Sequence, residues 1–257
     1  MISRYAVWLN DIALTEVDPD ILITDIGYQA VRQELNTEHL AARAGLYTGS
    51  GQPYYPETVV AVAFQLRKYH TVDRQAVTQD IIRWALNGGW LKTSDRPGQK
   101  IYVQCSRFPT INSVLRWTDS LAIEFTAYDF PFWVDEAVQS IILSDSDTSG
   151  KIYLPGSFST GVELTIEARS ALTRVNIGVG ETALNLANLS VSAGDVITVG
   201  YSARHHLLEI QQGTTSILDK RTADSDDELI AVPGSNTVEF STDGSAVCTV
   251  SVRGCYA

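Results

Sequence analysis

The feature that most constrains the fold of this chain is the regular alternation of short apolar segments and turn residues after residue 150. Gly, Pro, Asn and Asp recur there roughly every 8 to 12 residues, and apolar and polar positions alternate between them. This spacing is typical of a β-sandwich or jelly roll, in which each short strand ends at a turn. Val162, Leu164 and Ile166 supply one predicted row of inward-facing side chains.

Residues 226–240, DDELIAVPGSNTVEF, predict one hairpin of this sandwich. Pro233 presets the φ angle of the second position of a turn, and Gly234 takes the left-handed conformation that a type II turn needs next. Val238 and Phe240 resume the alternating apolar pattern after the turn. The pattern predicts a fold, but it includes no catalytic motif.

The first part of the chain has a different composition. All five Trp residues lie within the first 133 residues, whereas only five aromatic residues follow residue 150. β-branched content and alternation predict mostly strands here. Strands are predicted at 21–29, 59–67 and 100–108, and residues 113–133 predict two strands that turn at Asp119–Ser120.

One amphipathic helix is predicted among these strands, at residues 73–90. Asp73 is the predicted N-cap, and Gly88–Gly89 can end the helix. A single helix with one apolar face packs against a sheet, so we expect a β-sandwich or barrel-like domain with one packed α-helix. The apolar face comprises Val77, Ile81, Trp84 and Ala85.

The change in composition also predicts a domain boundary. Residues 143–150, LSDSDTSG, are small and polar and separate the two regimes. We therefore expect an N-terminal domain at 1–142 and a C-terminal jelly-roll β-sandwich at 143–257, in a protein that is mainly β.

Charge argues against binding to a phosphate backbone. Of the net charge of −11, residues 1–150 contribute −6 (12 Lys and Arg, 18 Asp and Glu) and residues 151–257 contribute −5 (7 and 12). Neither part can neutralise phosphates by a basic surface.

Cysteine usage and hydropathy predict the environment of the chain. Cys105, Cys248 and Cys255 are odd in number and form no CxxC pair, so we expect reduced thiols and assembly in a cytosol. The longest apolar run, at 59–64, is too short to span a bilayer, and the N-terminus lacks the pattern of a signal peptide. The sequence predicts a soluble protein with no membrane insertion.

The chemistry-bearing residues favour structural interpretations. Residues 145–150 begin like a calcium loop, but Gly156 stands where the bidentate Glu belongs. His205 and His206 are adjacent in a predicted strand, so they point to opposite faces and cannot share one site. The carboxylates at 224–228 crowd a predicted solvated loop, and no P-loop, nucleophile elbow or dinucleotide fingerprint occurs. We therefore expect no enzyme activity, no catalytic residue, no cofactor and no metal.

One aromatic, Gly-rich loop remains as a candidate contact surface. Residues 45–57, GLYTGSGQPYYPE, join strand-like segments and are unusually apolar for a solvated loop. The loop either folds over its own domain or contacts another protein, because Tyr is favoured in interfaces. The predicted interaction residues are Leu46, Tyr47, Gln52, Tyr54 and Tyr55.

The order of these motifs resembles the distal tail protein (Dit) family of long-tailed, siphovirus-type bacteriophages. In the first domain the resemblance comprises VVAVAFQLR at 59–67, IIRWA at 81–85, GGWLKTSDRPGQKIYVQC at 88–105, Pro109 and the stretch 117–133 that ends in DFPFW. In the second it comprises IYLPG at 152–156, LTIEA at 164–168, Gly194–Asp195 before VITV, and LIAVPGSNTVEF at 229–240, where Pro233, Gly234, Asn236 and Val238 match a recurring family phrase.

The resemblance implies a structural role. The family forms a homo-hexameric ring at the tail tip, which joins the tail tube protein to the tail-associated hub protein. Its C-terminal galectin-like sandwich points outward and, in some relatives, carries receptor-binding proteins. The implied location is the virion tail tip, after assembly in the host cytoplasm. Genomic DNA would pass through the ring without specific binding, which an acidic lumen favours.

An alternative is a carbohydrate-binding adhesion module for host attachment. Galectins hold sugar with an H-x-N-P-R stretch and a stacking Trp, whereas His205 is followed here by HLL and no Trp lies beyond residue 133. Tyr153 or Tyr201 could replace the stacking ring. A hydrolase has weaker support, because the histidines are isolated and the carboxylates are predicted to be solvated.

Overall fold

The computed structural model describes residues 5–29, 37–38, 47–48, 55–66, 71–109 and 120–257. Contacts within the chain divide it into two compact units, Met1–Trp133 with Ala257, and Val134–Tyr256. Antiparallel sheets dominate both units, so the predicted mainly β class is confirmed. The predicted boundary segment 143–150 lies within the second unit, where it connects two strands.

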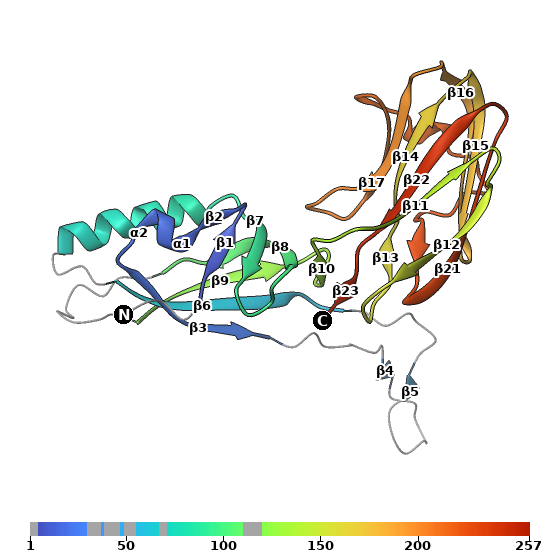
Figure 1. Cartoon of the computed structure of the whole chain (residues 1–257). Helices are drawn as coiled ribbons and strands as arrows, with labels where there is room; N and C mark the ends of the chain where they lie inside the picture. Colours follow the sequence, from blue (N-terminus) through green and yellow to red (C-terminus); the bar gives the residue numbers. More distant parts are fainter. Residues whose placement is uncertain (1–4, 30–36, 39–46, 49–54, 67–70, 110–119) are drawn as a thin grey trace. The chain divides into compact units, whose positions relative to one another are not determined.

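The first unit is built on one antiparallel sheet with the strand order β2-β1-β7-β8-β9-β6-β3 (Figure 1). Every second residue of β6 is buried, from Thr58 to Leu66, because successive side chains of a strand point to opposite faces of the sheet. The strands are β1 (Val7–Leu9), β2 (Ile12–Ala13), β3 (Ile21–Tyr28), β6 (Thr58–Leu66), β7 (Gly89–Thr93), β8 (Gln99–Arg107) and β9 (Ser120–Ala127). A separate pair comprises β4 (Thr37–Glu38) and β5 (Tyr47–Thr48).

Helix α2 (Thr71–Ala85) lies along one face of this sheet (Figure 1). Ile81 and Ala85 are fully buried, and the Trp84 ring packs edge-on against Phe125 of β9. The helix starts before the predicted N-cap, so Asp73 lies in its first turn, where a carboxylate favours the positive end of the helix dipole. A second, short helix, α1 (Leu14–Val17), was not predicted.

The end of α2 follows the sequence prediction. The Gly88 N–H donates to the Ala85 carbonyl at 3.0 Å, and Gly88 has a φ of +62°. A Cβ at Gly88 would also collide with the backbone carbonyl of Val103. Glycine is therefore required here both for the left-handed conformation and for the close approach of β8.

The second unit is a sandwich of two antiparallel sheets. One contains β11 (Gln139–Ser144), β22 (Ala246–Val252), β14 (Glu163–Ala168), β17 (Val196–Tyr201), β18 (Leu208–Gln212) and β19 (Thr215–Ser216), in that order. The other contains β12 (Ser149–Leu154), β21 (Gly234–Thr242), β15 (Leu172–Val179) and β16 (Thr182–Val191), in that order. Smaller elements are β10 (Trp133–Asp135), β13 (Thr160–Gly161), η1 (Leu218–Lys220), β20 (Ile230–Ala231) and β23 (Cys255–Tyr256).

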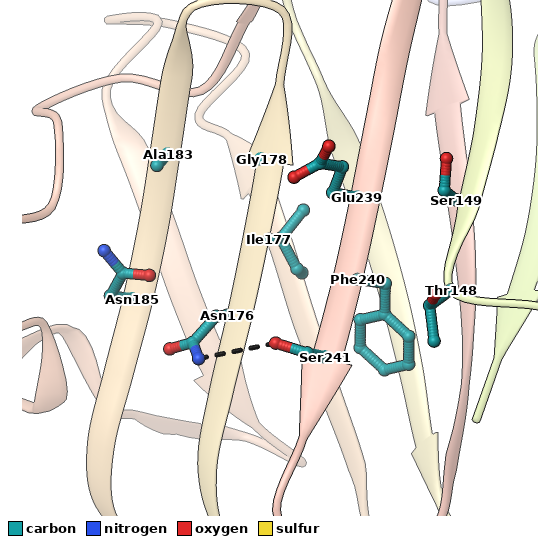
Figure 2. A pocket seen from close by; sticks show the side chains of 10 residues that line it. All are labelled: Thr148, Ser149, Asn176, Ile177, Gly178, Ala183, Asn185, Glu239, Phe240 and Ser241. Atoms are coloured by element: carbon teal, nitrogen blue, oxygen red, sulfur yellow. Dashed lines mark hydrogen bonds between the residues drawn. The ribbon is translucent and has the colours of Figure 1, made fainter.

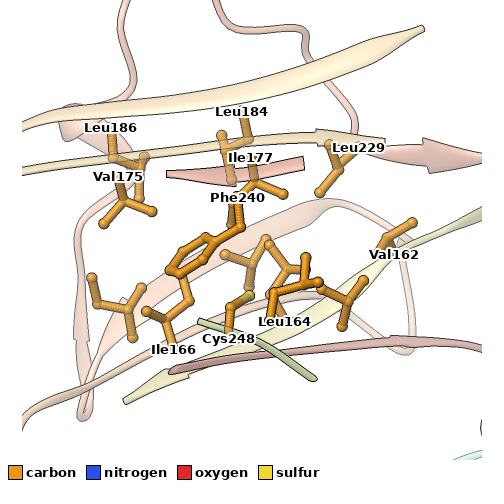
Figure 3. Packing of buried hydrophobic residues seen from close by; sticks show 14 of the residues in the cluster. Val162, Leu164, Ile166, Val175, Ile177, Leu184, Leu186, Leu229, Phe240 and Cys248 are labelled. Carbon is orange, nitrogen blue, oxygen red and sulfur yellow. The ribbon is translucent and has the colours of Figure 1, made fainter. Parts of the chain in front are cut away.

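The core of the second unit lies between these two sheets. Leu164 and Ile166 of β14 face Val175 and Ile177 of β15, and the Phe240 ring of β21 fills the space between them (Figure 3). The predicted row of Val162, Leu164 and Ile166 is buried in this core. Burial of such rows is the main stabilising contribution that a sandwich has.

Two local predictions for this unit are wrong. Residues 226–240 do not form a hairpin, because β20 pairs with β13, whereas β21 pairs with β12 and β15. The turn residue itself behaves as predicted, with a φ of +100° at Gly234. Within the alternating region after residue 150, residues 215–216 form only a two-residue strand, β19, and the 3₁₀ turn η1 follows it. His206 lies in a turn between β17 and β18 and not in a strand.

Candidate interaction surfaces

The predicted contact loop is only partly described. Leu46, Gln52 and Tyr54 lie outside the described residues, and Tyr47 lies in β5, which pairs with β4. Tyr55 is the one member whose side chain can be placed, and it is partly buried. The role of these five residues in protein contacts therefore stays a prediction.

The C-terminal end of that loop is fixed by aromatic packing. The ring of Tyr55 meets Phe132 edge-on at 5.3 Å between centroids, and Phe130 meets Phe132 in the same way at 5.2 Å. Next to them, the Thr58 hydroxyl donates to the Pro131 carbonyl at 2.7 Å. Edge-to-face pairs add to the energy of apolar burial, so this end of the loop has a defined position in the first unit.

A second aromatic cluster in the first unit surrounds Arg96. Its guanidinium lies over the rings of Tyr28 and Trp133, 5.1 and 4.9 Å from their centroids. The Tyr28 hydroxyl donates to the Asp95 carboxylate at 2.6 Å and lies 3.0 Å from the Thr93 hydroxyl. Burial, and then the Asp95 carboxylate, raise the pKa of Tyr28, so this phenol stays protonated and serves as a donor. No pattern in the sequence predicted this cluster.

One edge of the first unit's sheet is formed by β3. Among the described strands, β3 pairs only with β6, and its register shifts between Ile23 and Asp25. An edge strand presents backbone N–H and C=O groups that another chain can pair with, and a bulge limits that pairing. This edge is a candidate surface for contact with a neighbouring copy.

Two large apolar side chains of the first unit, Ile12 and Leu86, are exposed. Ile12 is 50% exposed and Leu86 is 61% exposed. Trp84 lies two residues before Leu86 in the chain, and its indole N–H donates to the Ile12 carbonyl at 3.1 Å. Large exposed apolar residues near a Trp are typical of protein–protein contact surfaces.

The turn that contains His206 packs against Tyr201 in the second unit. The imidazole stacks on the Tyr201 ring at 4.8 Å between centroids, and burial lowers the pKa of His206 to about 4. The Tyr201 hydroxyl donates to the Leu229 carbonyl and accepts from the Leu229 N–H, both at 2.9 Å. The ring and the hydroxyl of Tyr201 both make contacts within the unit, so this ring is unsuitable for stacking on a sugar.

The carboxylates at 224–228 are exposed, as predicted, but they also organise the loop. Asp226 accepts a hydrogen bond from the Ala183 N–H at 2.6 Å, and Asp227 pairs with Arg221 at 3.1 Å. A hydrogen bond from Thr222 lowers the pKa of Asp224. The loop runs along the free edge of β16 and covers it, which protects the sheet from unwanted pairing.

The described part of the chain contains few residues that are suited to metal binding or to thiol chemistry. No group of three or more His, Cys, Asp or Glu residues is arranged there to hold a metal ion. In the calcium-like stretch, Asp145 instead accepts a hydrogen bond from the Ala246 N–H at 3.2 Å. Burial raises the pKa of both Cys248 and Cys255 to about 12, so these thiols are not nucleophiles near neutral pH.

The described helices give no sign of a membrane-spanning segment. None of them combines the length and the apolar character that crossing a bilayer requires.

The two units define a mainly β protein with a sheet edge and exposed apolar side chains that other proteins can contact. Comparison with solved structures identifies its fold as that of phage tail proteins. SPP1 Dit (gp 19.1), described as a paradigm of the hub adsorption apparatus in phages that infect Gram-positive bacteria, aligns with a TM-score of 0.71 at 11% identity. That alignment covers 97% of this chain and 98% of the SPP1 chain.

A second solved structure supports the same fold. A chain of the phage P2 baseplate, in its activated conformation with Ca, aligns with a TM-score of 0.54 at 8% identity, over 99% of this chain and 98% of the other. No protein-family model and no curated protein matches the sequence. The predicted resemblance to distal tail proteins is thus confirmed in the fold.

Proposed function

We propose that this chain is a structural component of a phage tail tip, without enzyme activity. The observation that carries the proposal is the likeness to SPP1 Dit, which spans both units of the chain. A fold shared over the whole length supports a shared architecture, whereas the function itself depends on surfaces that the fold alone does not define.

The proposed assembly is a homo-hexameric ring that joins the tail tube protein to the tail-associated hub protein. We assign ring formation to the N-terminal domain and an outward position to the C-terminal galectin-like sandwich, which would offer a surface for receptor-binding or peripheral proteins. The exposed edge at β3 and the exposed side chains of Ile12 and Leu86 support contacts between copies. The residues at 45–57 are the proposed inter-subunit or tube-facing loop.

The net charge of −11 supports the passage of genomic DNA through such a ring without specific binding. A negative lumen repels phosphates and therefore does not retain them. The proposed location is the tail tip of the virion, and the reduced cysteines are in keeping with assembly in the host cytoplasm.

Light scattering coupled to size exclusion tests the assembly. We expect a species of about six times the 28.1 kDa chain mass, which dissociates in the variants Tyr47→Ala and Tyr54→Ala. Tyr128→Ala is the matched control, because Tyr128 is 51% exposed in the same unit but lies outside the loop. If all three variants assemble alike, the loop is not the contact surface. A defined oligomer of another size would contradict the ring.

A further inference from the structure

The outer face of the four-stranded sheet in the second unit contains a hollow of about 460 Å³ (Figure 2). Two rows of paired residues cross it. Ser149, Glu239, Gly178 and Ala183 form one row, each paired with the next across β12, β21, β15 and β16. In the second row, Asn176 pairs with Ser241 on one side and with Asn185 on the other.

Gly178, in the interior of β15, lies on the floor of the hollow. Its φ lies outside the left-handed region, and a Cβ there would meet Glu239 Cβ only at 3.9 Å and Thr182 O at 4.0 Å, which are ordinary contacts. Neither conformation nor space therefore requires glycine at this position. Glycine weakens a strand interior and often marks a site where a ligand approaches the backbone closely.

The polar groups around this floor retain hydrogen-bonding capacity. The Asn176 amide reaches Ser241 Oγ only at 3.5 Å, and the Asn185 amide reaches Asp224 Oδ2 at 3.4 Å. These distances are long, so the amides can rotate toward a ligand and both donate and accept. Glu239 adds an exposed carboxylate that accepts hydrogen bonds from hydroxyl groups.

The composition of the hollow also restricts the class of ligand. None of the described residues that line it is cationic, which disfavours phosphates and other anions. Its two large apolar residues, Ile177 and Phe240, are buried in the core and contribute no apolar wall to the outer face (Figure 3). A floor of backbone and small side chains with amide, hydroxyl and carboxylate groups suits a neutral ligand that is rich in hydroxyl groups.

We propose that this hollow binds one sugar unit of a neutral saccharide. The ring lies against Gly178 and Ala183, and its hydroxyl groups bond to Asn176, Asn185 and Glu239. A free sugar and a unit of a surface polysaccharide share this chemistry. Sugar binding at this site does not require the hexameric ring, so it can be tested separately from the proposed tail-tip role. Because no exposed aromatic ring lines the hollow, we expect weak, millimolar binding.

Saturation-transfer NMR on the full chain tests this site, with glucose, galactose, rhamnose and N-acetylglucosamine as probes. We expect at least one sugar to bind and the variant Gly178→Val to weaken its binding more than tenfold, because the new side chain fills the hollow. Gly27→Val is the matched control. Gly27 also lies in a strand interior, in β3 of the first unit, where an added Cβ would meet only Ala61 at 3.9 Å.

Circular dichroism establishes that each variant folds. If Gly178→Val does not fold, the double variant Asn176→Ala with Asn185→Ala replaces it and is expected to lose binding in the same way. Absence of binding by all four sugars would overturn the proposal. So would unchanged binding in a folded Gly178→Val protein, or equal loss in both glycine variants. Light scattering on the same samples reports assembly independently, which separates failure of this site from failure of the ring.

Discussion

The side chain of Asn236 fixes the turn at Pro233–Gly234 by hydrogen bonds, because the strands on either side of this turn do not pair with each other. Replacing Asn236 is therefore the most informative test of stability. The residue is 2% exposed. Its Oδ1 accepts from the Val232 N–H at 2.9 Å, and its Nδ2 donates to the Val232 and Gly234 carbonyls at 2.7 and 3.2 Å. Since β20 and β21 do not pair with each other, these bonds fix the chain between them.

The structure predicts a large cost for Asn236→Ala. Three hydrogen bonds at about 1 kcal/mol each give roughly 3 kcal/mol in the free energy of unfolding. Asn176→Ala is the matched control on the neighbouring strand β15. Its single side-chain bond is 3.5 Å long and exposed, so we expect a loss of about 0.5 kcal/mol or less.

Urea unfolding with two probes measures this difference. All five Trp residues lie in the first unit, so fluorescence reports that unit, whereas far-UV circular dichroism reports both. With a slope of about 2 kcal/mol per molar urea, Asn236→Ala should lower the midpoint of the second unit by about 1.5 M. A shift in Asn236→Ala no larger than that in Asn176→Ala would refute this account of the turn.

Three further predictions follow from individual residues. Burial lowers the pKa of His206 from its ordinary value near 6.5 to about 4, so the folded state binds fewer protons than the unfolded state. The second unit should therefore lose about 3 kcal/mol of stability as the pH falls from above 6.5 to 4, and His206→Asn should flatten this dependence in urea titrations at each pH. Gly161→Ala should lower the free energy of unfolding by about 1 to 3 kcal/mol, because a Cβ there collides with the Tyr201 ring. Gly200→Ala should change the free energy of unfolding little, because the space around that position is open. Equal effects of the two variants would contradict this packing. Iodoacetamide at neutral pH should leave the buried Cys248 and Cys255 unmodified. It should label the half-buried Cys105 slowly, because burial raises the pKa of that thiol to about 11. Rapid labelling of Cys248 or Cys255, measured by mass spectrometry of peptides, would disprove their burial.

Local patterns predicted the elements of this fold better than their pairing. The strand at 59–67 is β6 and the strand at 100–108 is β8, because a period of two in burial is visible in the sequence itself. The pairing of β20 depends on Thr160, which lies far from Ala231 along the chain. No local rule contains that information, so the hairpin prediction at 226–240 was wrong although its turn residue was right.

The candidate sites show the same limit. The hollow near Gly178 brings together four strands whose order follows from long-range pairing, and the only signal in the sequence is a glycine inside an alternating apolar segment. The cluster of Tyr28, Asp95 and Arg96 joins β3 to a turn after β7, and no motif links them in the sequence. Tyr55, by contrast, was singled out from the composition of its loop, although its contact role stays a prediction.

Cryo-electron microscopy of the tail tip of virions that contain this chain tests the central claim most directly. We predict six copies in a closed ring between the tail tube and the hub, with density that fits the two units described above. Virions whose tail tips lack this chain, or contain it in a number other than six, would contradict the account.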